Sequence, residues 1–355
     1  MKILLISYDL RRRGGIERLS LDVVGALQAQ GHHLVLLSTR RLGPGLIGRL
    51  LGQLWFLCQL AIASRRCEQL FCMHALLLAQ VDWLLPRPMP RLCWLHGVEV
   101  WGKALAPLAI ALCRCRLLVA SSNFTRSKVL EHSHPWPPVV VINPPARLWL
   151  GQVLPEPLPA QAQDLRMLTV ARMAADERYK GHDLIIEALC LLHTDNWHWQ
   201  IVGIGDDQPR LRALVNNLGL ADRVCFSGAL NDDQLRQAYQ DCNLLAMPSS
   251  YGLRADGSAM GEGFGITYLE AAMAGRASLA CIEGGQSDLI QAGKTGWLVQ
   301  PNVDDLLINL QAILNNHGEL ARRGAAAKQY ASNNFGFRNF EEAIKKTTQN
   351  LPLQA

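Results

Sequence analysis

The chain has 355 residues, of which 49% are hydrophobic and 18% are charged. This composition is typical of a globular α/β protein and excludes a chain that is disordered throughout. The length fits two domains. The ten cysteines include no Cys-x-x-Cys pair, and Cys113 and Cys115 have no His or Cys partners at zinc-binding spacing. We therefore expect free thiols in a reducing cytoplasm.

The net charge of +5 conceals a difference between the two halves of the chain. Residues 1–150 contain 18 Lys and Arg against 7 Asp and Glu, a net charge of +11, whereas residues 151–355 contain 17 against 23, a net charge of −6. A basic first half predicts either an anionic partner, such as a membrane surface or nucleic acid, or a solvated face without a partner. The chain has no recognisable nucleic-acid motif, so we expect no nucleic acid partner.

The first elements along the chain are predicted to form a βαβ unit. No signal-peptide pattern opens the chain, and residues 2–8 form a short apolar run that is typical of a buried strand. Glycines 14 and 15 then precede a helix predicted over residues 17–30 and a strand over 33–38. Later apolar runs predict strands at 92–95, 117–120 and 139–142. This alternation predicts a doubly wound parallel sheet.

Residues 46–63 form an unusual apolar stretch whose only charged residue is Arg49. Three interpretations are open: a buried core helix, a helix that lies on a membrane surface, and a transmembrane span. The stretch is flanked by Arg40, Arg41, Arg65 and Arg66. The expected location is therefore the cytoplasm, with peripheral attachment to the inner face of the plasma membrane as the alternative.

A second α/β series follows a segment, residues 143–164, that contains five prolines and is predicted to be an interdomain linker. The predicted strands lie at 167–170, 199–202, 224–226, 244–247 and 277–280, and the predicted helices at 183–193, 208–218, 232–240 and 266–274. We expect one domain over residues 1–150 and a second over 151–334. Residues 335–355 are expected to provide a helix, over 335–349, that crosses back onto the first domain.

The most informative stretch is Glu262-Gly-Phe-Gly-Ile-Thr-Tyr-Leu-Glu270, where two glutamates flank a glycine-rich helix start. Small residues there let the backbone N–H groups of Gly263, Phe264 and Gly265 approach an anion, which the helix N-terminus also favours. One carboxylate could hold the hydroxyls of a sugar and the other a ribose. Two solvated acids at an ordinary helix start remain the alternative.

Two cations are predicted at the ends of strands in the same half of the chain. Arg172 directly follows a strand, and Lys180 precedes a helix. Open α/β sheets bind ligands at the carboxyl ends of their strands. Two fixed cations could neutralise a leaving diphosphate without a metal. The alternative is a pair of solvated surface charges.

Together these residues resemble the retaining GT-B glycosyltransferases of glycosyltransferase family four, most strongly over residues 166–300. The stretch from Glu262 to Glu270 has the form of that family's paired-glutamate motif, and Val170-Ala-Arg172 with Lys180-Gly181 resembles its phosphate clamp. Further segments that resemble the family lie at 14–17, 96–97, 119–122, 201–205, 224–228, 247–249, 284–285 and 293–296. Two departures are the longer segment 251–261 and Gln286-Ser-Asp288, where family members often carry Pro-Glu.

The resemblance implies a GT-B fold, in which two Rossmann-like doubly wound parallel-sheet domains face each other across a cleft. It also implies that the first domain binds the acceptor and the second the nucleotide sugar. The implied catalytic residues are His96, Glu262, Arg172 and Lys180. The implied donor-binding residues are Gly15, Arg172, Lys180, Glu262, Gly263, Phe264, Gly265 and Glu270.

The function that the resemblance implies is the transfer of a hexose, with retention, from a UDP- or GDP-sugar to a glycan or lipid-linked acceptor. The expected setting is cell-surface polysaccharide or glycolipid biosynthesis. No metal or cofactor is expected, and the leaving phosphate would help to deprotonate the acceptor in a front-face displacement. A non-catalytic nucleotide-binding module, or another enzyme with this architecture such as an epimerase or phosphorylase, remains open.

Overall fold

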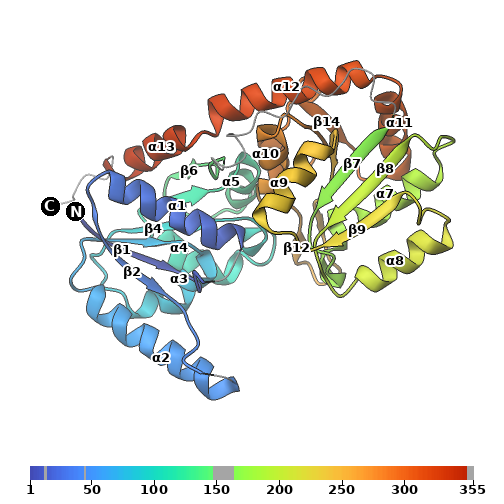
Figure 1. Cartoon of the computed structure of the whole chain (residues 1–355). Helices are drawn as coiled ribbons and strands as arrows, with labels where there is room; N and C mark the ends of the chain where they lie inside the picture. The colour runs from blue at the N-terminus through green and yellow to red at the C-terminus, as the bar shows by residue number, and fades with distance from the viewer. Residues whose placement is uncertain (12–13, 44, 147–163, 350–355) are drawn as a thin grey trace. The chain divides into compact units, whose positions relative to one another are not determined.

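The computed structural model describes residues 1–11, 14–43, 45–146 and 164–349. Two six-stranded sheets dominate these residues (Figure 1). Most of the predicted linker, residues 143–164, lies outside the described part of the chain. All ten cysteines are free thiols, as the sequence predicts.

The strands of the first sheet are all parallel to their neighbours, and they follow the order β2-β1-β3-β4-β5-β6. The strands are β1 (Lys2–Ser7), β2 (His33–Ser38), β3 (Gln69–Cys72), β4 (Arg91–Leu95), β5 (Leu117–Ala120) and β6 (Val139–Val141). The sequence analysis predicted all of them except β3, which is short and fully buried.

Helices cover this sheet and close its core. They are α1 (Gly15–Ala29), α2 (Gly45–Ala63), α3 (Ala75–Val81), α4 (Ala109–Cys113), α5 (Asn123–Leu130) and α13 (Phe337–Gln349). Three of the buried residues of α1, Leu19, Val23 and Leu27, recur every four positions, which places them on one helix face. From α13, Phe340 and Ile344 join the same core. The predicted crossing helix thus begins at Phe337 rather than at residue 335.

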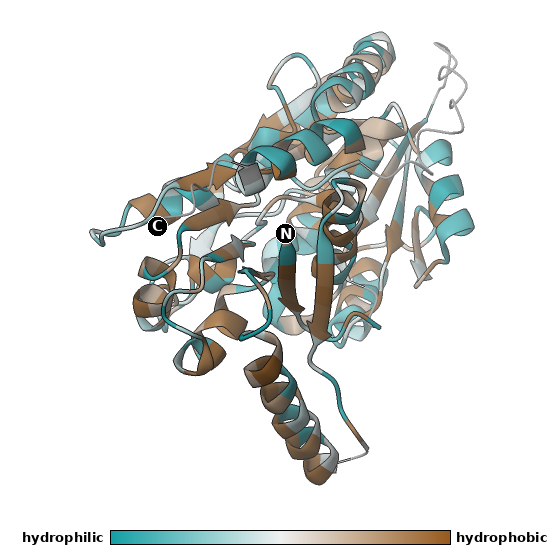
Figure 2. Ribbon diagram, turned by 90° about the vertical axis from the view of Figure 1, so that its left-hand side faces the viewer, coloured by the Kyte–Doolittle hydropathy of each residue, from teal (hydrophilic) through white to brown (hydrophobic). Residues whose placement is uncertain are grey.

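Helix α2 differs from the others because most of its apolar side chains are exposed. Only four of its 19 residues are buried: Gly48, Gly52, Phe56 and Leu60. The rest of the helix extends from the sheet as a largely hydrophobic element (Figure 2). The interpretation of residues 46–63 as a buried core helix is therefore wrong. The described residues contain one helix that is long and apolar enough to cross a membrane, and it is α2.

The second sheet is also parallel throughout, with the order β14-β13-β10-β7-β8-β9. Its strands are β7 (Leu165–Val170), β8 (Trp197–Val202), β9 (Val224–Gly228), β10 (Leu244–Ala246), β13 (Ala277–Cys281) and β14 (Gly296–Val299). Its helices are α7 (His182–Cys190), α8 (Gln208–Asn217), α9 (Asp232–Asp241), α10 (Ile266–Met273), α11 (Val303–Leu314) and α12 (His317–Asn334). The short pair β11 (Gly252–Leu253) and β12 (Ala259–Met260) lies within the segment before α10.

The two sheets are both doubly wound and parallel, but they differ in strand order. Numbered by their own succession, the strands run 2-1-3-4-5-6 in the first sheet and 3-2-1-4-5-6 in the second. Successive strands are added toward one edge of the sheet and then toward the other. This reversal of strand order falls between β1 and β3 in the first sheet and between β7 and β10 in the second. Ligands bind at such switch points in open α/β sheets.

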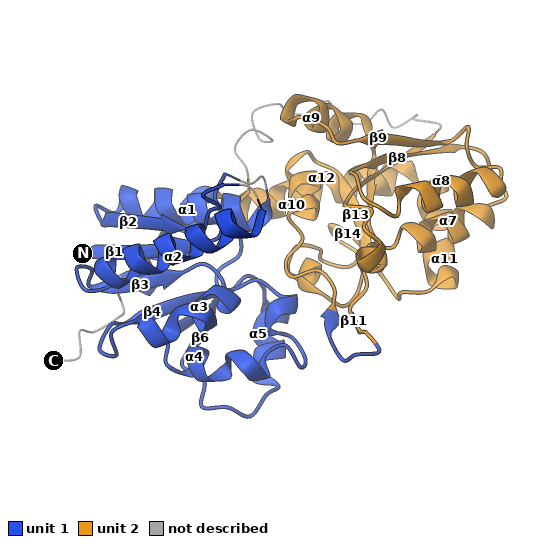
Figure 3. Cartoon of the chain, turned by 90° about the horizontal axis from the view of Figure 1, so that it is seen from below, with its two compact units in different colours: residues 1–145, 255–259, 337–355 blue, residues 146–254, 260–336 orange. Residues whose placement is uncertain are grey.

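By internal contacts, the chain separates into two compact units (Figure 3). Unit 1 comprises residues 1–145, 255–259 and 337–355, and unit 2 comprises residues 146–254 and 260–336. Each unit has its own hydrophobic core around its own sheet.

Candidate active site

The central contact of the candidate site is an ion pair between Lys180 and Glu262 in unit 2. Lys180 ends the 3₁₀ helix η4 (Ala175–Lys180), and Glu262 lies in the loop before α10. Lys180 Nζ donates to Glu262 Oε2 at 2.5 Å, and both side chains are more than four-fifths buried. Burial is the largest single influence on the pKa of Lys180 and lowers it, but the charge and hydrogen bond of Glu262, together with Tyr179 and Glu177, outweigh burial, so the pKa is raised overall and the amine stays cationic. The interpretation of Glu262 as a solvated acid is therefore wrong.

Glycines let these two loops approach closely. Gly181, which follows Lys180, has φ +86°, and a Cβ there would lie 2.6 Å from the carbonyl oxygen of Pro248 after β10. Gly265 has φ +93° and caps α10, and a Cβ on Gly285 would lie 2.2 Å from the carbonyl oxygen of Gly263. Larger residues would separate these backbones, so the glycines set the position of the Lys180–Glu262 pair.

Arg172 and Lys180, the two cations of the predicted phosphate clamp, pair with different carboxylates. The Arg172 guanidinium pairs with Glu177 of η4 and is 74% exposed, whereas Lys180 pairs with Glu262. Tyr179 lies among all four charges. Burial is the main cause of its raised pKa, and Lys180, Glu262, Glu177 and Arg172 each act on its hydroxyl electrostatically. The sequence analysis missed Tyr179 and Glu177, although both lie between Arg172 and Lys180, which it singled out.

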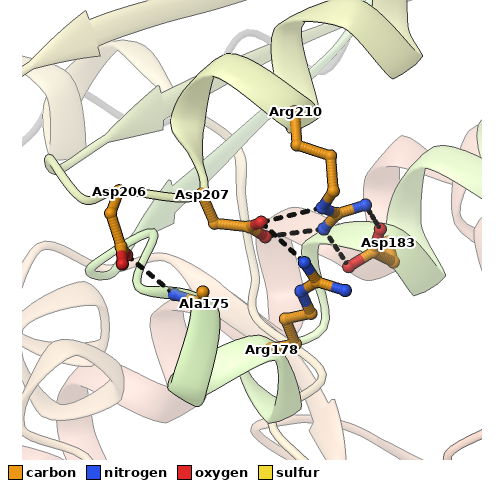
Figure 4. Close-up of polar contacts among 6 residues, drawn as sticks. All are labelled: Ala175, Arg178, Asp183, Asp206, Asp207 and Arg210. Carbon is orange, nitrogen blue, oxygen red and sulfur yellow. Dashed lines mark hydrogen bonds and ion pairs between the residues drawn. The ribbon is translucent and has the colours of Figure 1, made fainter.

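A second charged cluster holds η4 against α7 and α8 (Figure 4). Arg210 of α8 binds both carboxylate oxygens of Asp207 at 2.8 and 2.6 Å and both of Asp183 at 2.6 and 2.8 Å. Arg178 of η4 adds a contact of 3.0 Å to Asp207. Hydrogen bonds from Arg210 are the main cause of the lowered pKa of Asp207. No sequence motif indicated this cluster, because it joins residues 178–183 to residues 207–210, which are distant along the chain.

Glu270 is buried within α10 rather than solvated. Glu270 is 4% exposed, and the hydroxyl of Tyr239 in α9 donates a hydrogen bond to Glu270 Oε2 at 2.9 Å. Phe264 is also buried, and its ring lies 6.0 Å from the ring of Phe335. Phe335 therefore belongs to the core of unit 2 and does not start the crossing helix.

The segment where the sequence departs from the expected Pro-Glu has a structural role. Gln286 is fully buried, and its Nε2 donates to the carbonyl oxygens of Cys281 and Glu283, both at 2.8 Å, and of Ser249 at 3.3 Å. These bonds tie the loop after β13 to the turn after β10.

Residues 155–330 match the glycosyl transferases group 1 family. The chain belongs to this family. A GDP-mannose-dependent alpha-(1-6)-phosphatidylinositol monomannoside mannosyltransferase of Mycobacterium tuberculosis is 28% identical over 302 residues, which cover 70% of this chain and 76% of that protein. The putative colanic acid biosynthesis glycosyltransferase WcaL of Escherichia coli is 31% identical over 150 residues, 42% of this chain and 35% of that one.

Solved structures show that this glycosyltransferase has the GT-B fold that the sequence predicted. Anabaena HepE, solved in complex with UDP and glucose, aligns with a TM-score of 0.77 and 19% identity over 99% of this chain and 100% of that one. Sucrose-phosphate synthase from Thermosynechococcus elongatus aligns with a TM-score of 0.79 and 19% identity over 98% of both chains. At this identity the likeness establishes the fold.

In unit 1 of the glycosyltransferase, three rings line up at the switch point of the sheet. Tyr8, His74 and His96 follow β1, β3 and β4, and the ring of His74 lies 5.0 Å from that of Tyr8 and 5.5 Å from that of His96. His96 Nε2 donates to the carbonyl oxygen of Met73 at 2.6 Å. Burial lowers the pKa of His74 to about 4. Only His96 was singled out from the sequence.

Gly15 was predicted to bind the donor, and no metal site was expected. Gly15 is the exposed first residue of α1, after the cap residue Gly14. Within the part of the glycosyltransferase that the structure describes, no group of three or more His, Cys, Asp or Glu residues is placed to hold a metal ion. The roles of the predicted site residues and metal independence stay predictions.

Proposed function

We propose that this glycosyltransferase transfers a hexose, with retention and without a metal, from a UDP- or GDP-sugar to a glycan or lipid-linked acceptor. The observation that carries the proposal is the Lys180–Glu262 pair, which lies beside the N-terminus of α10. It combines a cation for a diphosphate with a carboxylate for sugar hydroxyls.

The donor diphosphate is proposed to bind Lys180, with Arg172 as the second cation. The backbone N–H groups of Phe264 and Gly265 form no hydrogen bond to any described residue, so they are available to phosphate oxygens. Negative charge grows on the departing phosphate during transfer, and cations fixed in advance stabilise it. The raised pKa of Lys180 keeps this charge present at neutral pH.

Glu262 is proposed to accept hydrogen bonds from the hydroxyls of the transferred sugar. When the diphosphate binds Lys180, it replaces the carboxylate as that cation's partner, so that Glu262 can accept from the sugar. Glu270 is proposed to hold the ribose, with Tyr239 fixing its carboxylate at 2.9 Å. His96 and Gly15 of unit 1 are proposed to orient the donor sugar or the acceptor.

The proposed mechanism follows from the resemblance to a retaining family. The leaving phosphate oxygen accepts the proton of the acceptor hydroxyl, on the same face of the sugar as the departing nucleotide. The names of the relatives support the donor and acceptor classes: one uses GDP-mannose and a phosphatidylinositol mannoside, another acts in colanic acid biosynthesis, and HepE was solved with UDP-glucose. We propose cell-surface polysaccharide or glycolipid biosynthesis as the setting.

The test compares nucleotide binding with sugar transfer in the presence of EDTA. UDP, GDP or ADP at one hundred times its dissociation constant should stabilise the wild type by about 2.7 kcal/mol. A Glu262→Gln variant should keep this stabilisation but lose transfer by about a hundredfold. Glu283→Gln, at an exposed acid in the same unit, should change neither.

The outcomes separate the proposal from its alternatives. Nucleotide binding without acceptor-dependent release of the nucleotide would indicate a non-catalytic module. Conversion of the sugar nucleotide without an acceptor would indicate another enzyme class with this architecture, because fold alone does not define reaction class. If no nucleotide stabilises the protein, the donor site is wrong. The anomeric configuration of the product, read by NMR, tests retention.

A further inference from the structure

An apolar face runs along the outer side of α2 in unit 1. Its positions recur every three or four residues along the helix, which places them on one side. The exposed fractions are 70% for Leu46, 73% for Ile47, 54% for Leu50, 49% for Leu51, 60% for Leu54 and 50% for Ile62. Figure 2 shows α2 as a mostly brown helix at the bottom of the view. Contiguous apolar surface of this kind marks interaction sites on proteins.

The opposite side of α2 is fixed to unit 1, so the apolar face cannot turn inward. A Cβ on Gly52 would lie 1.8 Å from the carbonyl oxygen of Arg40, which shows how closely the helix packs on the segment after β2. Leu42 N donates to the carbonyl oxygen of Gly48 at 2.9 Å. Phe56 and Leu60 are buried further along the helix. The orientation of α2 therefore follows from packing within one unit.

Basic residues lie on α2 and at both of its ends, and this segment of the chain contains no acid. Residues 40–67 contain five arginines, at positions 40, 41, 49, 65 and 66, and neither Asp nor Glu. All five are exposed, and Arg41, Arg49 and Arg66 form no ion pair with any described residue. The Arg40 guanidinium stacks 3.9 Å above the ring of Trp55. Apolar and aromatic side chains next to unpaired cations match the chemistry of an anionic membrane surface.

A pocket of about 800 Å³ opens along the same helix and has the same mixed character. Its polar rim includes Arg40, Arg41 and Arg49, and its apolar part includes Phe56 and Leu57. The acids Asp9 and Glu17 also line it, and Asp9 is already paired with Arg11. The arginines that line this pocket can bind an anionic group such as the phosphate of a lipid headgroup.

The connections of α2 favour a helix that lies on the membrane over one that crosses it. A helix of 19 residues is about 28 Å long, nearly the thickness of the hydrocarbon core. However, α2 follows β2 and precedes β3, and both strands pair with β1 in the same direction. Its two ends are thus tied to one sheet, on one side of any bilayer.

We propose that α2 docks unit 1 on an anionic lipid bilayer. Ile47, Leu54 and their neighbours on the outer face enter the boundary between headgroups and acyl chains, and the flanking arginines contact lipid phosphates. The proposal rests on α2 alone and is independent of the nucleotide chemistry of unit 2. It would bring the protein to the surface where lipid-linked acceptors are found.

Co-sedimentation with vesicles tests the docking face in the full-length chain. The wild type should pellet with vesicles of phosphatidylcholine and phosphatidylglycerol and much less with phosphatidylcholine alone. Ile47→Gln/Leu54→Gln should weaken binding to the anionic vesicles on the order of tenfold or more, because both side chains are exposed and apolar. Arg41→Gln/Arg49→Gln should weaken it about thirtyfold, since each surface cation contributes about fivefold.

Matched controls come from the same unit. Ile110→Gln removes an equally exposed apolar side chain on α4, and Arg87→Gln removes an exposed arginine elsewhere. Both should pellet as the wild type does, and every variant should keep the wild-type thermal unfolding midpoint.

Three outcomes would overturn the proposal. Equal recovery in the supernatant with both vesicle types would exclude an anionic membrane as the partner. Protein that resists extraction by alkaline carbonate would indicate a span. A dimer that Ile47→Gln/Leu54→Gln dissociates, without vesicle binding, would assign the face to a second copy of the chain.

Discussion

The two units use the same kind of sheet but treat charge differently at its carboxyl edge. In unit 2 the cations Arg172 and Lys180 already have carboxylate partners, and a further cluster around Arg210 fixes the segment between them. In unit 1 the edge carries the neutral rings of Tyr8 and His74, and the arginines on and around α2 stay exposed.

The difference suits the two kinds of anionic partner proposed above. A buried charge needs a partner, because leaving it unpaired in a low-dielectric interior is costly. A diphosphate that replaces Glu262 must therefore match a fixed geometry around Lys180. Exposed arginines cost little in the free protein, so they suit a partner that offers charge density without a defined shape.

The largest effect is expected from removing Lys180 at the proposed donor site of unit 2, compared with changing His96 in unit 1. Lys180→Ala should lower transfer by a hundred- to a thousandfold, about 3 to 4 kcal/mol, and should weaken UDP or GDP binding, because it removes the paired cation. His96→Gln should lower turnover but leave nucleotide affinity within about twofold. Calorimetric titration and steady-state kinetics measure both. Lys294→Ala, at an exposed lysine in unit 2, is the control. Unchanged nucleotide affinity in Lys180→Ala would contradict the assignment.

The next largest effect is the loss of stability when a buried charge cluster is broken, compared with the loss when an exposed ion pair is broken. Asp207 is 5% exposed and binds both Arg210 and Arg178, whereas the side chain of Asp195, the partner of Arg223, is 88% exposed. Asp207→Asn should lower the free energy of unfolding by about 2 to 3 kcal/mol and weaken nucleotide binding by loosening η4. Asp195→Asn should change stability by less than about 1 kcal/mol. Urea unfolding provides the measurement, and equal effects of the two changes would refute the structural role of the cluster.

A pH effect is expected in both units, because each buries a histidine. Burial lowers the pKa of His182 in unit 2, and of His74 in unit 1, to about 4. Their unfolded values lie near 6.5, so the unfolded chain binds more protons below that pH. The free energy of unfolding should therefore fall as the pH falls from about 6.5 to 4, by about 2 kcal/mol per histidine between pH 7 and 5.

Substitution of each buried histidine tests whether it causes the loss of stability at low pH. His182→Gln should reduce the difference between urea unfolding at pH 7 and at pH 5 in unit 2, and His74→Asn should do so in unit 1. His198→Gln changes an exposed histidine and should leave the difference unchanged. A wild type that is equally stable at both pH values would contradict the prediction.

The smallest effect concerns a glycine that no contact requires. Gly25 lies inside α1, and a Cβ there would meet nothing within 4 Å. Gly25→Ala should therefore stabilise the protein by about 0.5 to 1 kcal/mol, because alanine is the better helix former. Gly181→Ala is the contrast: its φ of +86° and its proximity to Pro248 should make the change destabilising. Thermal unfolding of the two variants measures the difference, and a destabilising Gly25→Ala would contradict the expectation.

The sequence by itself determined the two α/β series, because short apolar runs indicate strands and helical spacing indicates one helix face. It predicted β2 and β5 with their observed bounds and placed Lys180 and Glu262 in segments that the structure brings together. It missed β3 and β14.

Only the tertiary structure decided which charges meet and which faces stay exposed. Arg172 pairs with Glu177 rather than joining Lys180, and Asp207 meets Arg178, 29 residues away, as well as Arg210, because each cation has several carboxylates within reach and the fold decides which one it meets. The sequence of the apolar run at 46–63 left a core helix, a helix on a membrane surface and a span open. Packing through Gly48 and Gly52 on one side of α2, with the other side left open, ruled out the core.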